Sequence, residues 1–472
     1  MNEDRLAFAS IEQLAPLVAK KKVSPVKLVE IFLSRIARLN PRLNAYLTVT
    51  ADQARAQARH AEKELLKGRR GPLHGIPISL KDNIWTRGVR TTAGSKILSD
   101  FIPERDATTV RRLRRAGAIV LGKTNLHEFA YGVTTNNPHF GPTRNPWDTE
   151  RIPGGSSGGS AAAIAAGLCV ASVGSDTGGS VRIPAALCGV VGLKPTFGRV
   201  SCYGVVPLSP SLDHVGPLTR TVADAAIMLG VIAGRDPLDP ATITAAAARD
   251  LRRWRGRISH LRLGWPREYF WEKLDDEVRR HVEAAARWFE REGARIEQVS
   301  LPHLAESAET TTHIALAEAR HFHQSAGYFP ARSADYSEEV RKRLEMGADV
   351  RAVDYLRAFE LRKLVQADFN QAFVAVDAIL APTVPIAAPR IGEERIAIGS
   401  EEESVRNALL RLNRPANLTG LPALSVPCGF TGAGLPVGLQ LIGQAGEEAR
   451  LLRIAGAYEQ AAEWHQQRPP AM

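Results

Sequence analysis

The stretch of small residues between positions 151 and 200 constrains the fold more than any other part of this sequence. It holds 11 of the 39 glycines, together with many serines and alanines. These residues are interleaved with apolar ones, as in 161–168 and 190–193, and a flexible linker does not show that pattern. Small side chains let two backbone segments approach closely, and glycine adopts conformations that other residues resist. We therefore expect this stretch to be buried, tightly packed and close to a functional site.

The overall composition is that of a globular protein. Of the 472 residues, 44% are hydrophobic and 24% are charged, which excludes global disorder, collagen and a coiled coil. No run of 18 apolar residues is present, so no membrane-spanning helix is expected. The N-terminus lacks a basic start followed by an apolar run, so no signal peptide is expected. The sequence predicts a cytoplasmic protein that does not contact a membrane.

Metal chemistry has no support in the sequence. The cysteines Cys169, Cys188, Cys202 and Cys428 form no CxxC pair, so neither a disulfide scaffold nor a zinc site is predicted. The 12 histidines are scattered, and no HExxH motif is present. We expect no metal ion, and Cys188 is expected to be a small core residue rather than a nucleophile.

Hydrophobic spacing predicts helices alternating with strands. Residues 24–39 carry apolar side chains at helical spacing, and Ser24 is a natural N-cap. Short apolar runs at 76–80 and 118–121 are typical of buried strands. This alternation indicates an α/β layer architecture. Residues 274–370 are predicted to be mostly helical, and the pattern alone supports no firm domain boundary.

Positive charge is concentrated in the N-terminal quarter. Residues 1–125 hold 24 Lys+Arg against 11 Asp+Glu, in a chain of net charge +11, and the run 111–115 contains four arginines. A nucleic-acid or other anionic partner is one interpretation of this surplus. A solvated helix face with Leu113 turned inward is favoured, because no interleaved aromatic residues or nucleic-acid motif accompany the run.

Three segments are candidates for chemistry, and each is a weak signal when taken alone. The run 154–160 contains G-x-S-x-G, but loop-forming residues precede it, whereas the nucleophile elbow of an α/β-hydrolase follows a strand. The run 174–180 places a serine after two glycines, where backbone N–H groups can converge on an oxyanion. Lys81 ends an apolar strand. It is either a solvated strand end or, when desolvated and neutral, a base.

Taken together and in order, these segments closely resemble the amidase signature family, the Ser-Ser-Lys amidohydrolases. Residues 154–186 carry most of the resemblance, and Lys81 lies in a similar segment upstream. The other similar segments are 73–83, 122–125, 188–195, 211–217, 417–429 and 434–443. The resemblance implies one domain over residues 1–472, an α/β fold with α/β/α layers around a large mixed sheet, and no cofactor.

The resemblance also assigns roles to individual residues. Ser180 matches the acylated nucleophile, Ser156 the bridging serine that the family holds with a cis peptide bond, and Lys81 the base. A neutral Lys81 would take the proton of Ser180 through Ser156, and the same path would return it to the leaving nitrogen. The resemblance places the oxyanion hole on the backbone N–H groups of Thr177, Gly178, Gly179 and Ser180. It places Ala130 and Tyr131 on the acyl side of the substrate pocket.

The family contains free-standing hydrolases and the glutaminase subunit of a tRNA-dependent amidotransferase. Members of the second group usually have Gln where Ile183 and His214 stand here. These departures favour a free-standing serine amidohydrolase that cleaves amide or carbamate (urethane) bonds of small molecules. The glutaminase subunit is the alternative. A non-catalytic basic binding protein is disfavoured, because Lys81, Ser156 and Ser180 are intact.

Three further expectations concern the surroundings of this site. Asp176 and Arg182 flank the nucleophile and are expected to form a structural ion pair or hydrogen-bond network. Residues 260–370 resemble the family least and are expected to be a variable helical region that shapes the substrate pocket. The partners expected are a small-molecule amide or carbamate and a second copy of the chain in a homodimer, with no membrane and no nucleic acid.

Overall fold

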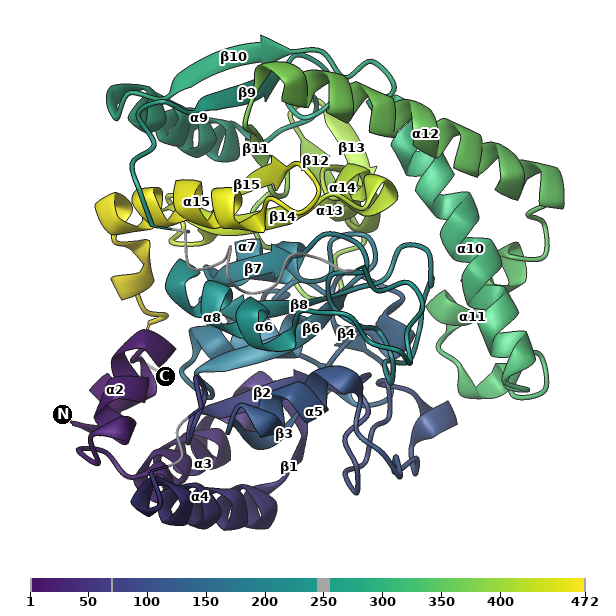
Figure 1. Ribbon diagram of the computed structural model, residues 1–472. Coiled ribbons are helices and arrows are strands. Elements are labelled where there is room, and N and C mark those ends of the chain that lie inside the picture. The colour runs from purple at the N-terminus through teal and green to yellow at the C-terminus, as the bar shows by residue number, and fades with distance from the viewer. Residues whose placement is uncertain (1, 69–70, 244–254, 471–472) are drawn as a thin grey trace.

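An eleven-stranded sheet runs through the molecule (Figure 1). The computed structural model describes residues 2–68, 71–243 and 255–470. From edge to edge the strands are β1 (Tyr46–Val49), β3 (Ile119–Thr124), β2 (Pro77–Lys81), β6 (Ala171–Asp176), β8 (His214–Thr219), β7 (Val191–Lys194), β14 (Ala423–Phe430), β15 (Pro436–Gly443), β11 (Ala378–Pro382), β9 (Arg262–Pro266) and β10 (Arg295–Val299). β2 is parallel to β3 and β6, and β9 is parallel to β10 and β11, whereas the other pairs are antiparallel. The sheet is mixed, as predicted.

Side chains of the central strands alternate between two buried clusters. In β11, Ala378 and Leu380 belong to one cluster, whereas Ile379 and Ala381 belong to another. Successive side chains of a strand point to opposite faces of the sheet, so both faces are covered. The predicted α/β/α layering is confirmed.

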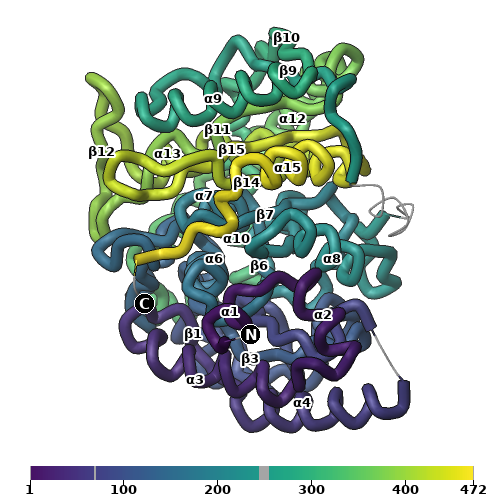
Figure 2. Tube along the Cα trace, turned by 90° about the vertical axis from the view of Figure 1, so that its left-hand side faces the viewer, coloured from purple at the N-terminus to yellow at the C-terminus, as the bar shows by residue number. Residues whose placement is uncertain are grey.

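Two sets of helices cover these faces. The first set, onto which Figure 2 looks, comprises α8 (Val222–Ile232), α9 (Asp276–Arg291) and α15 (Glu448–Ala462). The second set comprises α7 (Arg182–Cys188), α12 (Ala352–Ala375) and α14 (Arg414–Thr419). Side chains of α7 meet β15 closely, because a Cβ atom at Gly438 would lie 2.5 Å from Cβ of Ala186.

The remaining elements surround this core. Helix α10 (Ser307–Ser325) packs against both α12 and α11 (Glu338–Met346) on one side of the molecule (Figure 1). The other helices are α1 (Glu3–Ala7), α2 (Ile11–Ala19), α3 (Pro25–Leu43), α4 (Ala51–Leu66), α5 (Thr108–Arg115), α6 (Gly158–Ala165) and α13 (Val405–Arg411). The short strand pairs are β4 (Asn136–Asn137) with β5 (Gly141–Pro142), and β12 (Arg395–Ile398) with β13 (Glu401–Ser404). Among the described residues, 3-10 helices are found at Lys96–Leu98, Glu128–Ala130, Leu304–Glu306, Ser333–Asp335 and Trp464–Gln466.

Local signals placed several of these elements correctly. Ser24 caps α3 as predicted, because its side chain accepts the backbone N–H of Val26 at 3.1 Å. The helix continues beyond the predicted residue 39 to Leu43 and ends where Asn44 adopts a left-handed conformation. The prediction for 274–370 missed β10, which pairs with β9 at the edge of the sheet.

The glycine-rich stretch is buried and tightly packed, as expected. Every residue of α6 is buried. A Cβ atom at Gly159 would lie 2.5 Å from the carbonyl oxygen of Asn125 and 2.6 Å from that of Ala45. Only glycine allows α6 to approach the neighbouring backbone this closely, and this approach holds the preceding loop, which carries Ser156, inside the fold.

The arginine-rich run lies on α5, in agreement with the predicted helix face. Leu113 is fully buried, whereas Arg112 donates to the carbonyl oxygens of Ile232, Gly234 and Arg235. In the described part of the chain, no helix is both long and apolar enough to cross a bilayer.

Candidate active site

Three separate segments bring Lys81, Ser156 and Ser180 into the interior. Lys81 is the last residue of β2, Ser156 lies in the loop before α6, and Ser180 lies in the loop between β6 and α7. β2 and β6 are parallel neighbours, so the end of β2 reaches the residues that close β6. Lys81 Nζ lies 2.7 Å from Ser156 Oγ. The backbone N–H of Ser157 donates to the carbonyl oxygen of Ser180 at 3.2 Å, which ties the two serine loops together.

The surroundings of Lys81 favour its neutral form. The side chain is fully buried, and burial lowers its pKa from 10.5 to about 7, although Asp176 and Asp213 oppose this shift. Its Nζ also lies 2.9 Å from Ser175 Oγ, a contact that the sequence did not reveal. A lysine with this pKa is a base near neutral pH, because a substantial fraction of it carries no proton.

Hydrogen bonds to its carbonyl oxygens fix the loop of Ser156. The Gly155–Ser156 peptide bond is cis, as the family resemblance implied. Thr135 Oγ1 donates to the carbonyl oxygen of Gly154 at 2.8 Å, and the N–H of His127 donates to that of Ser156 at 3.2 Å. These contacts orient the Ser156 hydroxyl toward Lys81.

The loop before α7 presents backbone donors next to Ser180. Of the four donors that the resemblance implied, Gly179 is engaged elsewhere, because its N–H donates to Asp176 Oδ1 at 2.8 Å. Within the described residues, the N–H groups of Thr177, Gly178 and Ser180 have no hydrogen-bond acceptor. These three residues line a common cavity. An oxyanion bound there would meet up to three free donors rather than four.

A second carboxylate holds this loop from its other side. Thr177 Oγ1 donates to Asp213 Oδ1 at 2.5 Å, and Asp213 Oδ2 accepts the backbone N–H of Leu208 at 2.9 Å. Burial raises the pKa of Asp213 to about 6, against the opposing effect of its hydrogen bonds. Asp213 lies in the segment 211–217 that resembles the family, but the resemblance assigned it no role, so its contact with Thr177 emerges only from the fold.

Asp176 and Arg182 form the predicted structural pair. Both are fully buried, and Arg182 donates to both carboxylate oxygens of Asp176, at 3.0 and 3.1 Å. The Arg182 guanidinium holds the pKa of Asp176 well below its usual range. The remaining guanidinium hydrogens donate to Gln440 Oε1, Asn417 Oδ1 and the carbonyl oxygen of Asn413, so the network ties α7 to β15 and α14.

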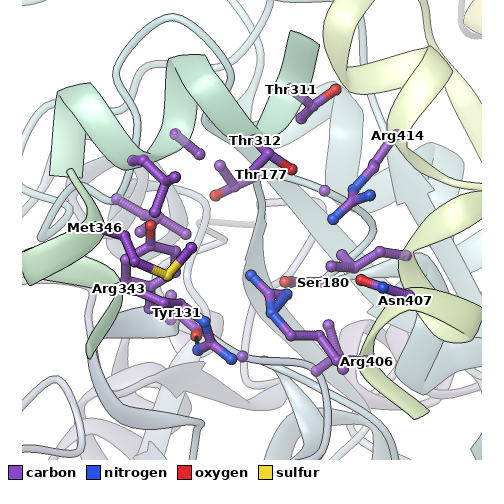
Figure 3. A pocket seen from close by; sticks show the side chains of 18 residues that line it. Tyr131, Thr177, Ser180, Thr311, Thr312, Arg343, Met346, Arg406, Asn407 and Arg414 are labelled. Atoms are coloured by element: carbon purple, nitrogen blue, oxygen red, sulfur yellow. Dashed lines mark hydrogen bonds between the residues drawn. The ribbon is translucent and has the colours of Figure 1, made fainter. Parts of the chain in front are cut away.

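A cavity of about 310 Å³ opens onto Ser180 (Figure 3). Ala130 and Tyr131, which the resemblance assigns to the acyl side of a substrate pocket, are among the residues that line it. Three arginines also line it: Arg343 on α11, Arg406 on α13 and Arg414 on α14. No sequence signal pointed to them, because they come from three helices and none belongs to a recognisable motif.

Comparison with known proteins identifies the family. The sequence model of the Amidase family matches residues 27–452. The chain belongs to the amidase family. It is 42% identical to the A subunit of the glutamyl-tRNA(Gln) amidotransferase of Geobacter metallireducens, over 97% of this chain and 98% of that protein. Identity to the protein of the same name from Roseiflexus castenholzii is 44%, over 98% of this chain and 97% of that one.

Among solved structures, one is described as "An unexpected vestigial protein complex reveals the evolutionary origins of an s-triazine catabolic enzyme". It superposes with a TM-score of 0.91 at 36% identity, covering 96% of this chain and 98% of that one. As a member of the amidase family, the chain belongs to a class of enzymes that act on carbon–nitrogen bonds.

These relatives correct the expected partners. A small-molecule substrate and a second copy of the chain were the only partners predicted, and this prediction is wrong. The relatives are named as a subunit of a glutamyl-tRNA(Gln) amidotransferase, and the solved structure is described as a protein complex. The error came from the weight given to Ile183 and His214. Both are buried, and neither lines the cavity at Ser180. Their identities therefore reflect the packing of the core and do not indicate the substrate.

Proposed function

We propose that the chain is the amide-cleaving subunit of an amidotransferase-type assembly and releases ammonia from an amide donor. The observation that carries this proposal is the identity of 42–44% to amidotransferase A subunits along nearly the full length of both chains. The site supports the amide-cleaving role, since a buried lysine of low pKa contacts a serine and free backbone donors face a cavity.

The proposed reaction begins with proton transfer. Neutral Lys81 takes a proton from Ser156, and Ser156 takes one from Ser180 as Ser180 Oγ attacks the amide carbon. The N–H groups of Thr177, Gly178 and Ser180 stabilise the oxyanion. Each such donor contributes about 10²–10³-fold to the rate in serine hydrolases.

When the tetrahedral intermediate formed by this attack breaks down, the proton is passed on to the leaving nitrogen. Because an unprotonated amine is a poor leaving group, Lys81 passes a proton through Ser156 to the leaving nitrogen. The C–N bond breaks, ammonia departs, and the acyl group stays on Ser180. Water then attacks the acyl-enzyme, again with Lys81 as base, and releases the carboxylate.

We further propose that residues 260–370 shape the substrate pocket within one domain spanning residues 1–472. The cavity contacts support this assignment, since α10 supplies Thr311, Thr312, Ala315 and Leu316, and α11 supplies Arg343 and Met346. Exchanging residues 307–346 for those of a relative should change the preferred amide. An unchanged preference would contradict this assignment.

The test of the proposed function is ammonia release from L-glutamine and other primary amides. The chain is assayed alone and after co-expression with the remaining subunits of a glutamyl-tRNA(Gln) amidotransferase. We expect the other subunits to co-purify and to stimulate release, and Ser180→Ala to lower it by roughly 10⁴–10⁶-fold. Ser325→Ala, at the exposed end of α10, is the matched control. Full activity without any effect of the other subunits would instead indicate a free-standing amidase.

A further inference from the structure

The cavity next to Ser180 has an unusual charge distribution. Three guanidinium groups line it, and its lining within the described residues contains no aspartate or glutamate. Figure 3 shows Arg406 and Arg414 turned toward the space beside Ser180. A positively charged group entering this cavity would meet three cations and no lining anion, whereas an anion would meet three donors.

Two of these arginines form no hydrogen bond or ion pair within the described protein, although Glu339 and Glu403 lie near enough to stabilise the charges of Arg406 and Arg414, respectively. Arg414 is only 8% exposed, and no hydrogen bond or ion pair of its side chain to any described residue is present. The side chain of Arg406, which is half-buried, likewise forms no hydrogen bond or ion pair with any described residue. Buried guanidinium groups are ordinarily paired, because an unpaired buried charge is costly. These two are therefore poised to pair with a ligand.

The third arginine is held in place by the protein. Arg343 pairs with Glu339 and donates to the carbonyl oxygen of Tyr131. Its guanidinium also lies 5.3 Å from the centre of the Tyr131 ring. Glu339 is not among the residues that line this cavity; it lines an adjoining one, which Arg343 and Arg406 also border, so it holds Arg343 from outside the cavity at Ser180.

The arginines also repel one another. Burial, Arg343 and Arg414 together lower the pKa of Arg406 to about 9, although Tyr131 and Glu339 oppose this shift. A bound carboxylate would offset both the energetic cost of burying these charges and the repulsion between them. Planar guanidinium groups match the geometry of a carboxylate, which they bind through two parallel hydrogen bonds.

We propose that Arg406 and Arg414 select an amide donor whose acyl group carries a carboxylate and no ammonium group, that is, the monoamide of a dicarboxylic acid. This inference rests on the proposed function and names its substrate class. The far carboxylate binds the two free guanidinium groups, and the amide carbon faces Ser180. Hydrolysis consumes water, breaks the C–N bond, and yields the dicarboxylate and ammonia.

Three amides of equal chain length test this proposal: glutaramate, pentanamide and L-glutamine. Glutaramate carries the carboxylate alone, pentanamide carries neither group, and glutamine adds an ammonium group. The complex is assayed for ammonia release. We expect kcat/KM for glutaramate to exceed that for pentanamide by about 10²-fold, as buried charge pairs allow. We expect glutamine to lie at least about tenfold below glutaramate.

Variants assign the preference to the arginines. Arg406→Gln and Arg414→Gln should each lower the ratio of kcat/KM for glutaramate to that for pentanamide by at least about tenfold. Arg395→Gln is the matched control, since it removes the same charge from an exposed pair with Glu402. Equal rates for glutaramate and pentanamide, a preference for glutamine, or a ratio unchanged by the variants would overturn the proposal.

A binding measurement separates this proposal from the proposed function. Calorimetry on the Ser180→Ala protein compares glutaramate with pentanamide and needs no turnover. Tighter binding of glutaramate that is lost when Arg406→Gln is added supports the charge selection even when no amide is cleaved. Equal binding of both amides overturns it. Absence of Ser180-dependent ammonia release from every amide overturns the proposed function instead.

Discussion

Lys81 Nζ lies 2.7 Å from Ser156 Oγ, although the two residues are 75 positions apart in the chain. The end of β2 supplies the lysine, and the loop that precedes α6 supplies the serine. Since burial lowers the pKa of Lys81 to about 7, the contact joins a hydroxyl to a group that can accept its proton.

The rate of amide cleavage should therefore follow the protonation of Lys81. Below about pH 7 the lysine is protonated and cannot act as base, so kcat/KM falls as the pH decreases. Above it, kcat/KM reaches a plateau. A pH–rate profile of kcat/KM measures this apparent pKa. A profile that is flat between pH 5 and 9 in ~0.1 M salt would contradict the assigned base, and Lys81→Met should abolish the pH-dependent activity.

Asp213 should act as a positioning residue through Thr177. Asp213→Ala or Thr177→Val removes the 2.5 Å contact that holds the donor loop. We expect either change to lower kcat by roughly tenfold or more, by the misplacement of an oxyanion donor. In a double-mutant cycle the two losses should not add, because both residues act through one hydrogen bond. Additive losses would contradict a shared role for the two residues. An unchanged KM in each variant shows that substrate binding is preserved.

Breaking the Asp176–Arg182 pair should destabilise the fold. Arg182→Met leaves Asp176 buried without its cation, and removing one partner of a buried pair costs about 3–5 kcal/mol. Urea unfolding measures the loss. In the exposed control Arg55→Met, which breaks the pair with Glu30, the expected loss is below about 1 kcal/mol. Similar losses in the two variants would refute the structural role of the buried network.

Gly159→Ala tests the close approach of α6 to its neighbours. The added Cβ would lie 2.5 Å from a backbone oxygen, so the helix must shift at a cost of about 1–3 kcal/mol. Gly432→Ala is the control, because its Cβ meets only Glu277 Oε1 at 3.5 Å. Thermal unfolding compares both variants with the native chain. Unfolding midpoints that match in the two variants would mean that the small-residue packing is not required.

Local signals predicted much of the fold. The cap at Ser24 and the apolar runs that became β2 and β3 depend on neighbours in sequence. The small residues of α6 predicted its burial, although its packing partners, Asn125 and Ala45, are distant in sequence. The family resemblance added the roles of Lys81 and the two serines.

The rest depends on contacts between distant segments. Arg343 follows Glu339 at i+4, which is the spacing of an ordinary surface ion pair on a helix, so nothing marked it as part of a cavity. Arg406 and Arg414 reach that cavity only because α13 and α14 fold over it. The engagement of Gly179 by Asp176 likewise requires the conformation of the loop.

Trapping the acyl group tests the central claim most directly. The native protein is mixed with glutaramate, quenched with acid within the first turnover, and digested, and its peptides are weighed by mass spectrometry. We predict a glutaryl group on the peptide that contains Ser180, absent from Ser180→Ala. Ammonia release with no adduct, or with an adduct on another residue, would contradict a mechanism that passes through Ser180.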